Sequence, residues 1–447
     1  MVVQDRTRLT GLLGGTKAKG LKIVKDETFV GNKQTDPCLT PKRKQNASGV
    51  IESESAYLSR GVSAVKEDVH RAVSFQDKGL FPGAFCKVFP DPAGDIQFCA
   101  ALHADGAGTK SSVAYLMYRE SGDPSWFSGL AQDALIMNTD DLLCIGAVDQ
   151  FYISNTIGRN AHRIDGDCLS ALIGGYDAIL SRLNQAGIKA IMTGGETADV
   201  GDLVQTVICD ATVFVRLPRR QVIDASRIRP GLSIIGFSSF GTMKGEKKEN
   251  SGIGSNGLTA ARHVLLHEDY RTRYPESYAQ TLSPEQAYCG IWHLEDRLPG
   301  SELTLGEALL SPTRTYLPVM KEIFSQIGTD PVLGLIHCTG GGQTKCLSFG
   351  HSVRFIKDNL FPTPPLFAAI RDSGQIKDQE MYQVFNMGHR LELYCDSSVV
   401  DEILAICRAY ELEARIIGRT EPGDGENEVV IKDHGKTFVY RSQKSRG

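Results

Sequence analysis

Glycines that follow short apolar segments mark the places where this sequence carries its most reactive side chains. The run Asp105–Lys110 (DGAGTK) comes directly after the apolar segment Ile96–His103, a pattern that predicts a strand entering a glycine loop. A carboxylate there can hold Mg²⁺ while loop N–H groups and the lysine face phosphate oxygens. The spacing differs from the GxxxxGK[ST] pattern of a Walker A loop. A tight turn with a capping aspartate fits the same residues, so the motif alone leaves both interpretations open.

A second group of carboxylates lies in Ser128–Gly146, whose pattern predicts a helix. Asp133 and Asp141 share one face of that helix, about 12 Å apart, whereas Asp140 points about 100° away from them. Carboxylates among apolar neighbours are costly to bury unless they are paired or bound to a metal. Metal binding and a solvated helix face are therefore the two interpretations of these aspartates.

Two glycine-rich segments in the C-terminal half have the character of phosphate sites. Gly252–Gly257 ends immediately before the predicted helix Leu258–His263, whose N-terminus could receive a phosphate. Thr339–Gly342 is a similar segment, and His337, just upstream, is either an acid or base near a ligand or a packed strand residue. Arg314, in the segment SPTR, suits either a phosphate or a surface carboxylate.

The elements that must position these groups alternate between helices and strands. The apolar stripe over Leu169–Leu183 predicts a second helix ended by Gly187, and Ile188–Met192 predicts a short strand. Thr193–Thr197 is then expected to be a loop, followed by a long strand over Leu203–Arg216. This alternation indicates an α/β fold.

The chain divides into an extension and two folded parts. Residues 1–50 carry ten Lys or Arg against four acids and no sustained apolar periodicity, which is typical of a disordered extension. A polar connector rich in arginine and proline precedes a new apolar strand at Leu232–Phe237. We therefore expect an N-terminal domain over residues 51–228 and a C-terminal domain over residues 229–447.

Composition excludes several classes of protein. Of the 447 residues 41% are hydrophobic, and no apolar run reaches the ~18 residues that a spanning helix needs. The net charge is −4, and after residue 50 the chain has 39 Lys or Arg against 49 Asp or Glu, a balance that disfavours nucleic-acid binding. Eleven cysteines, an odd number without a CxxC pair, indicate reduced thiols in the cytoplasm and give no signature of a zinc site.

In their order along the chain, these motifs closely resemble those of the phosphoribosylformylglycinamidine cyclo-ligase (AIR synthetase) family. The motifs are, in order, Asp105–Lys110, Asp140-Asp141, Gly194–Ala198, Ser255–Gly257, Ser311–Arg314, Thr339–Gly342 and Phe385–Gly388. The resemblance extends from about residue 57 to the C-terminus.

The resemblance implies an α/β subunit with two domains, an N-terminal mixed sheet with helices and a C-terminal α/β domain. It implies a homodimer in which the N-terminal sheets of two subunits join into a shared barrel. The implied activity is that of a cytoplasmic ligase of purine biosynthesis, which uses ATP and Mg²⁺ to close formylglycinamidine ribonucleotide to 5-aminoimidazole ribonucleotide. ATP would phosphorylate the formyl oxygen, and the amidine nitrogen would displace the phosphate. Neither a nucleic acid nor a membrane is an implied partner.

The resemblance also implies roles for individual residues. The ATP site would comprise Asp105, Gly106, Gly108, Thr109, Lys110, Gly194, Gly195, Glu196 and Thr197. The substrate site would comprise Ser255, Asn256, Gly257, Arg314, Gly340, Gly341 and Gly342. Asp105 and Asp141 would be metal ligands, and His337 would be the catalytic acid or base.

Some positions depart from the family pattern and indicate a divergent branch. Asp140 replaces the asparagine of the family's Asn-Asp pair, and Gly254 stands where the family has histidine. Selenophosphate synthetase and thiamine-phosphate kinase, which share the aspartate-lined ATP site, are alternatives. The former needs a reactive cysteine three residues before a lysine, and Ala84 holds that position before Lys87. An inactive nucleotide-binding scaffold is the remaining alternative.

Overall fold

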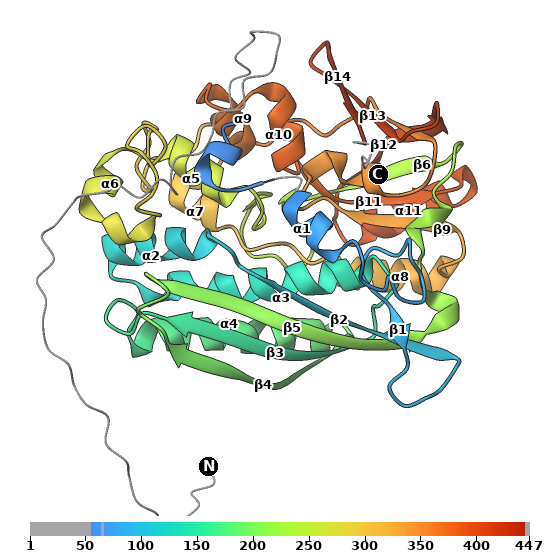
Figure 1. Cartoon of the computed structure of the whole chain (residues 1–447), viewed down its shortest axis with the longest axis horizontal. Helices are drawn as coiled ribbons and strands as arrows, with labels where there is room; N and C mark the ends of the chain where they lie inside the picture. The colour runs from blue at the N-terminus through green and yellow to red at the C-terminus, as the bar shows by residue number, and fades with distance from the viewer. Residues whose placement is uncertain (1–54, 64–66, 443–447) are drawn as a thin grey trace, which may run out of the picture. The chain divides into compact units, whose positions relative to one another are not determined.

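The computed structural model of this chain describes residues 55–63 and 67–442. The predicted extension over residues 1–50 lies outside the described residues. The described residues belong to one compact unit, which contains two large sheets with helices packed between and around them (Figure 1). The predicted α/β fold is confirmed, whereas the predicted boundary between residues 228 and 229 stays a prediction.

The first sheet is built from the N-terminal part of the chain. Its strand order is β1-β2-β5-β3-β4, and the β3–β4 pair is parallel while the others are antiparallel. The strands are β1 (Phe89–Pro90), β2 (Phe98–Gly106), β3 (Gln150–Arg159), β4 (Lys189–Asp199) and β5 (Val207–Pro218). The helices of this part are α1 (Glu67–Val73), α2 (Lys110–Ser121), α3 (Ser128–Leu143) and α4 (Gly166–Gln185).

Helices α3 and α4 cover one face of this sheet. The predicted stripe on α4 is buried at Leu172, Tyr176 and Leu183, which confirms the helical periodicity there. The two helices approach closely at Gly175, where an added Cβ atom would lie 2.1 Å from the carbonyl oxygen of Ser128. Helix α3 also contacts β9 and α8 of the second part, so it is packed on both sides. This position explains why aspartates on α3 are buried instead of solvated.

Two predicted boundaries are wrong at the glycines. The segment Thr193–Thr197, expected to be a loop, belongs to β4, which continues to Asp199 because residues 194–199 pair in parallel with β3. Thr193 itself lies at an irregularity in the register. Strand β2 likewise runs to Gly106, past the predicted end at His103, because β5 pairs with it up to Asp210. Pairing with a long neighbouring strand overrides the low strand propensity of glycine at these positions.

The second sheet is built from the C-terminal part, in the order β14-β13-β10-β12-β6-β11-β9. Its strands are β6 (Ser233–Ser238), β9 (Val332–His337), β10 (Val353–Lys357), β11 (His389–Cys395), β12 (Ala414–Pro422), β13 (Glu428–Asp433) and β14 (Lys436–Arg441), and β7 (Phe240–Gly241) pairs with β8 (Asn250–Ser251) in a small separate sheet. The helices are α5 (Leu258–Leu265), α6 (Asp269–Arg273), α7 (Leu305–Leu310), α8 (Leu317–Ile327), α9 (Pro365–Asp372), α10 (Asp378–Val384) and α11 (Val400–Ala409). Every residue of β11 is buried, so polar groups on this strand must find partners inside the protein.

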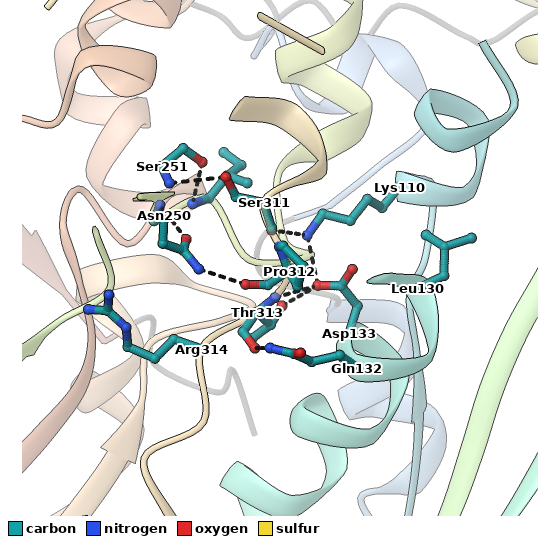
Figure 2. A network of polar contacts seen from close by, with 12 residues as sticks. Lys110, Leu130, Gln132, Asp133, Asn250, Ser251, Ser311, Pro312, Thr313 and Arg314 are labelled. Carbon is teal, nitrogen blue, oxygen red and sulfur yellow. Dashed lines mark hydrogen bonds and ion pairs between the residues drawn. The ribbon is translucent and has the colours of Figure 1, made fainter. Parts of the chain in front are cut away.

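The segment between α7 and α8 joins the two parts through a buried ion pair (Figure 2). Lys110 Nζ donates to Asp133 Oδ1 and to the carbonyl oxygen of Ser311, each at 2.7 Å. The same carboxylate oxygen accepts the backbone N–H of Thr313 at 2.8 Å and its hydroxyl at 2.5 Å. Asn250 of β8 donates to the Pro312 carbonyl from the other side. The ammonium and carboxylate are fully buried, so each depends on the other for its charge.

We expect Asp133→Asn to destabilise the fold strongly, because it leaves the buried Lys110 ammonium without a counter-charge. The expected loss is about 3–5 kcal/mol in the free energy of unfolding, measured by urea unfolding. The matched control is Lys248→Met, which breaks the exposed Lys248–Glu307 pair and should cost less than about 1 kcal/mol. Equal losses of unfolding free energy in the two variants would contradict the conclusion that the buried Lys110–Asp133 pair stabilises the contact between the two parts.

Candidate functional site

Four positions on different strands lie in one row across the first sheet. Asp105 on β2 is paired with Ala211 on β5, Ala211 with Asn155 on β3, and Asn155 with Gly195 on β4. The neighbouring row runs from Gly106 to Glu196 through the same strands. Three strand spacings separate the ends of a row, roughly 14 Å. Two of the predicted ATP-binding segments, far apart in the sequence, therefore occupy the same level of the sheet.

The loop from β2 to α2 leads from this level toward the second part of the chain. Asp105 is exposed, and one of its carboxylate oxygens accepts the N–H of Gly106 at 2.7 Å. Gly108 has φ of +58°, a conformation that favours glycine, and Thr109 follows it at the start of α2. The Thr109 hydroxyl lies 2.8 Å from that of Thr259 on α5. This contact brings the Asp105 loop beside the beginning of α5.

The predicted substrate segment before α5 is tied to the second glycine segment. Asn256 Nδ2 donates to the carbonyl oxygens of Thr339, at 3.1 Å, and Val384, at 2.5 Å. Gly257 has φ of +83°, and an added Cβ would lie 2.3 Å from the Phe385 ring, so only glycine fits. The hydroxyl of Ser255 is buried and has no hydrogen-bond partner. A buried hydroxyl without a partner is costly, and a ligand oxygen at this point would satisfy it.

The second glycine segment forms a tight turn with one open position. The N–H of Gly342 donates to the carbonyl oxygen of Thr339 at 2.7 Å, and Gly341 and Gly342 both have positive φ. An added Cβ at Gly342 would lie 2.5 Å from the Tyr382 carbonyl oxygen. An added Cβ at Gly340 would have no atom within 4 Å. The structure thus connects the segments around Asp105, Ser255 and Gly340 through a series of contacts.

A carboxylate held between two histidines lies behind these loops. Asp141, near the end of α3, has Oδ2 at 3.0 Å from His103 Nε2 and Oδ1 at 2.6 Å from His337 Nδ1. His103 is on β2, on the same face of the strand as Asp105, and His337 is the last residue of β9. The Asp141 carboxylate therefore joins α3 to one strand of each large sheet.

Hydrogen bonding fixes the charge of His103. Asn138 Nδ2 donates to the carbonyl oxygens of Asp105 and Ala211, which leaves Asn138 Oδ1 as the acceptor for His103 Nδ1 at 2.9 Å. Because His103 Nε2 faces the Asp141 carboxylate, both ring nitrogens carry protons. Burial alone would lower the pKa of His103, but the hydrogen bond and charge of Asp141 raise it to about 9. Burial would raise the pKa of Asp141, and the hydrogen bonds from His103 and His337 instead hold it well below its usual range.

His337 is fully buried and acts from behind Asp141. Its Nδ1 donates to the carboxylate, and its Nε2 accepts from Arg390 Nη1 at 2.5 Å, so the ring is neutral with its proton on Nδ1. Arg390 also pairs with Asp140 Oδ2 at 2.9 Å. No ring atom of His337 reaches solvent, whereas the Asp141 side chain is 13% exposed. Any influence of His337 on a ligand must pass through Asp141 in this conformation.

Two residues predicted to contact ligands are engaged inside the fold. Lys110 is held by Asp133 and Ser311. The buried Arg314 guanidinium pairs bidentately with Glu246 and donates to the carbonyl oxygens of Phe240 and Gly241 (Figure 2 shows the position of Arg314). A phosphate contact would require either cation to leave a buried partner. Both assignments stay predictions, and in this structure both residues stabilise the site from within.

Sequence reasoning missed His103, Asn138 and Arg390. His103 carried a signal, because it lies two residues before Asp105 on a predicted strand and so shares its face. Asn138 carried a weaker one, three residues before Asp141 on the predicted helix. Arg390 carried none, because its partners come from α3 and from β9, which local patterns cannot bring together.

Two models of one protein family match most of the chain. Residues 90–215 match the AIR synthase related protein, N-terminal domain, and residues 229–431 match the AIR synthase related protein, C-terminal domain. The chain belongs to the AIR synthase related family. The two matches contain almost all the residues of the site described above, from Asp105 to Arg390.

Individual relatives cover most of the chain. The phosphoribosylformylglycinamidine cyclo-ligase of Methanococcus vannielii is 27% identical over 362 residues, which are 78% of this chain and 87% of that enzyme. The enzyme of the same name from Myxococcus xanthus is 28% identical, over 86% of this chain and 97% of its own length. Among solved structures, thiamine-monophosphate kinase from Stenotrophomonas maltophilia is similar with a TM-score of 0.43 and 14% identity, over 82% of this chain and 96% of that one.

We expect the His103–Asp141 pair to make stability depend on pH. Because the pKa of His103 is raised in the folded state to about 9, its contribution is fully present below the unfolded value of about 6.5 and is lost as pH rises through about 9. The contribution is at most about 3 kcal/mol. Urea unfolding of wild type and His103→Gln at pH 6 and above pH 9 checks this: the difference between them should shrink at the higher pH. A difference that does not change with pH would contradict the assigned charge.

Proposed function

We propose that this protein closes formylglycinamidine ribonucleotide to 5-aminoimidazole ribonucleotide at the expense of ATP, in de novo purine biosynthesis in the cytoplasm. The observation that carries the proposal is the convergence of the Asp105 loop, the Ser255–Gly257 segment and the Thr339–Gly342 turn through the Thr109–Thr259 and Asn256–Thr339 contacts. The cyclo-ligase names of the relatives support the same activity. Within residues 55–63 and 67–442, no helix combines the length and apolar character needed to cross a membrane.

The residues present fit ATP and Mg²⁺. Asp105 is exposed at a strand end and has one carboxylate oxygen free of the Gly106 N–H, which suits a hard cation that prefers oxygen ligands. Asp141 could contribute only through lone pairs that its two histidines leave unused. Both the surrounding protein and the Asp141 charge raise the pKa of Asp105, and a bound cation would offset that effect. Asp105 is therefore the main metal ligand in this proposal, with Asp141 behind it.

The chemistry requires stabilisation of a phosphoryl group more than a protein nucleophile. When bound, Mg²⁺-ATP supplies the phosphoryl group that converts the formyl oxygen into a leaving group, so that the amidine nitrogen can close the ring and release phosphate. The open glycine backbone at Gly108 and Gly340 lets N–H groups approach phosphate oxygens closely. The Ser255 hydroxyl is available to a substrate oxygen. The cationic His103 keeps Asp141 ionised and fixed in place beside Asp105.

The subunit also presents a surface suited to a second copy. On the face of the first sheet opposite α3 and α4, one complete row reads Leu102, Phe214, Tyr152 and Ile191, with each residue paired to the next. Leu102 is 58% exposed and Ile191 40% exposed. An apolar row of this kind across an uncovered sheet is typical of an interface. We infer that two subunits pair through these sheets to form a homodimer.

We expect ADP release by the purified protein to require formylglycinamidine ribonucleotide together with Mg²⁺-ATP, and to yield 5-aminoimidazole ribonucleotide. Asp105→Asn should reduce the rate by about 100-fold or more, because one charged ligand to the metal is lost. Asp177→Asn, on the exposed side of α4, is the matched control and should leave the rate unchanged. ADP release that ignores the ribonucleotide would point to another phosphoryl acceptor, and a folded protein that binds ATP without any turnover would point to an inactive scaffold.

We expect Tyr152→Glu combined with Ile191→Glu to produce monomers, because both charges would be buried against like charges of the partner copy. Sedimentation equilibrium of wild type and variant at the same concentrations measures the change. The control is Ile291→Glu, which is 79% exposed and does not belong to the sheet. A dimer that survives the double substitution would place the interface elsewhere.

A further inference from the structure

A long connection in the C-terminal part is closed at its base by backbone pairing. Residues 266–304, between α5 and α7, contain only the five-residue helix α6 and one short 3-10 turn among their regular helices. Leu266 is bridged to Trp292 and His267 to Gly290 in parallel fashion. The N–H of His267 donates to the Trp292 carbonyl at 2.8 Å, and that of Trp292 to the Leu265 carbonyl at 3.0 Å. Long connections of this kind in compact proteins usually serve a purpose.

This pairing brings two histidines and an aspartate together. The His267 and His293 rings stack with centroids 4.8 Å apart and planes 28° apart. Asp269 Oδ2 lies 3.2 Å from His267 Nδ1 and 3.5 Å from His293 Nε2. One donor atom from each of the three residues lies within 4.8 Å of the others. None of these residues belongs to the site proposed for ATP and substrate.

The distances match the edges of a metal coordination shell. Ligands at the Zn–N and Zn–O distances of about 2.0–2.2 Å in tetrahedral geometry are roughly 3.3–3.5 Å apart. The two Asp269 Oδ2 distances, 3.2 and 3.5 Å, are close to these values. Hydrogen bonds to a single carboxylate oxygen would be shorter, about 2.7–2.9 Å for charged partners. The nitrogens therefore surround the oxygen at a spacing that leaves room for an ion between them.

No proton lies between His267 Nδ1 and Asp269 Oδ2. The backbone N–H of Asp269 points at His267 Nδ1, at 3.3 Å, which makes that nitrogen an acceptor. In this tautomer an unprotonated nitrogen faces the carboxylate oxygen, so two acceptors lie side by side. A cation bound there would replace that repulsion with attraction, and His267 Nδ1 would give up the weak contact with the Asp269 N–H, because the nitrogen has a single lone pair to offer. Asp296, whose Oδ2 accepts the N–H of His293 at 2.6 Å, adds a further negative charge 3.9 Å from the His293 Nδ1.

We propose that His267, Asp269 and His293 bind one Zn²⁺ ion, or a similar divalent transition-metal ion. Two imidazoles and one carboxylate suit such ions, whereas Mg²⁺ and Ca²⁺ prefer oxygen ligands throughout. The three side chains are 35%, 56% and 35% exposed, so the ion can enter directly and water can complete its coordination. The ion links the start of the connection, at His267, to His293, next to the backbone bridges that already join these two segments.

The test is zinc binding by the full chain after treatment with a chelator. Zn²⁺ is titrated against a chromophoric competitor with wild type, with His267→Asn combined with His293→Asn, and with His434→Asn as the matched control. His434 is also an exposed histidine near one aspartate, Asp433, but it has no second histidine beside it. We expect wild type and control to bind one equivalent more than the double variant. Wild type and the control should gain thermal stability from zinc, whereas the double variant should not.

Two further measurements keep the result interpretable. Thermal midpoints without metal should be similar among the three proteins, because the substituted rings are only half-buried. If the double variant is unfolded, Asp269→Asn replaces it and should weaken binding. Co²⁺ in place of Zn²⁺ should give a spectrum without thiolate charge-transfer bands, which separates this site from the free cysteines. Equal stoichiometry in all variants, thiolate bands on the bound Co²⁺ or no zinc bound by wild type would each overturn the proposal and leave a hydrogen-bonded His-Asp-His cluster.

Discussion

The structure depends on one largely buried carboxylate, that of Asp141, whose two oxygens are each held by a histidine. His103 brings β2 of the first sheet to it, and His337 brings β9 of the second. Strand β2 leads into the Asp105 loop, and β9 leads into the Thr339–Gly342 turn. The two contacts therefore connect the two halves of the proposed site. If the carboxylate were absent, the cationic His103 would be left partly buried without a counter-charge, a costly state. The relative placement of the two halves therefore rests on an electrostatic contact as well as on apolar packing.

The charges around Asp141 alternate and balance. The cationic His103 faces the Asp141 carboxylate, and the neutral His337 lies between Asp141 and Arg390. Arg390 also pairs with Asp140. Lys110 and Asp133 form a second balanced pair further along α3. Helix α3 can be buried on both faces because each of its aspartates finds a cation on a different neighbouring element. The asparagine-to-aspartate departure at position 140 fits this pattern, since Arg390 lies opposite it.

Sequence patterns predicted the elements well where one face is apolar, as on α4, and predicted the order of the motifs. They failed at Thr193–Thr197, because the partner strand β3 decides the conformation there and no local residue reports it. The family resemblance placed Lys110 and Arg314 in ligand sites by motif position, and these assignments stay predictions. Both side chains are long enough to reach inward, and their burial depends on Asp133 and Glu246, which local spacing does not connect to them. Sequence spacing shows which groups can act together, whereas the fold decides which of them still have free donors.

Gly254 shows how a departure from the family pattern can be accommodated. It has φ of +65°, and an added Cβ would lie 3.4 Å from Arg390 Cδ and 3.9 Å from Thr313 Oγ1. A histidine side chain at this position would extend into the neighbourhood of the Arg390–Asp140 pair and compete for its polar groups. With glycine, Arg390 is left to His337 and Asp140. Positions 254 and 140, the two expected departures from the family pattern, therefore both lie beside the same Arg390 guanidinium.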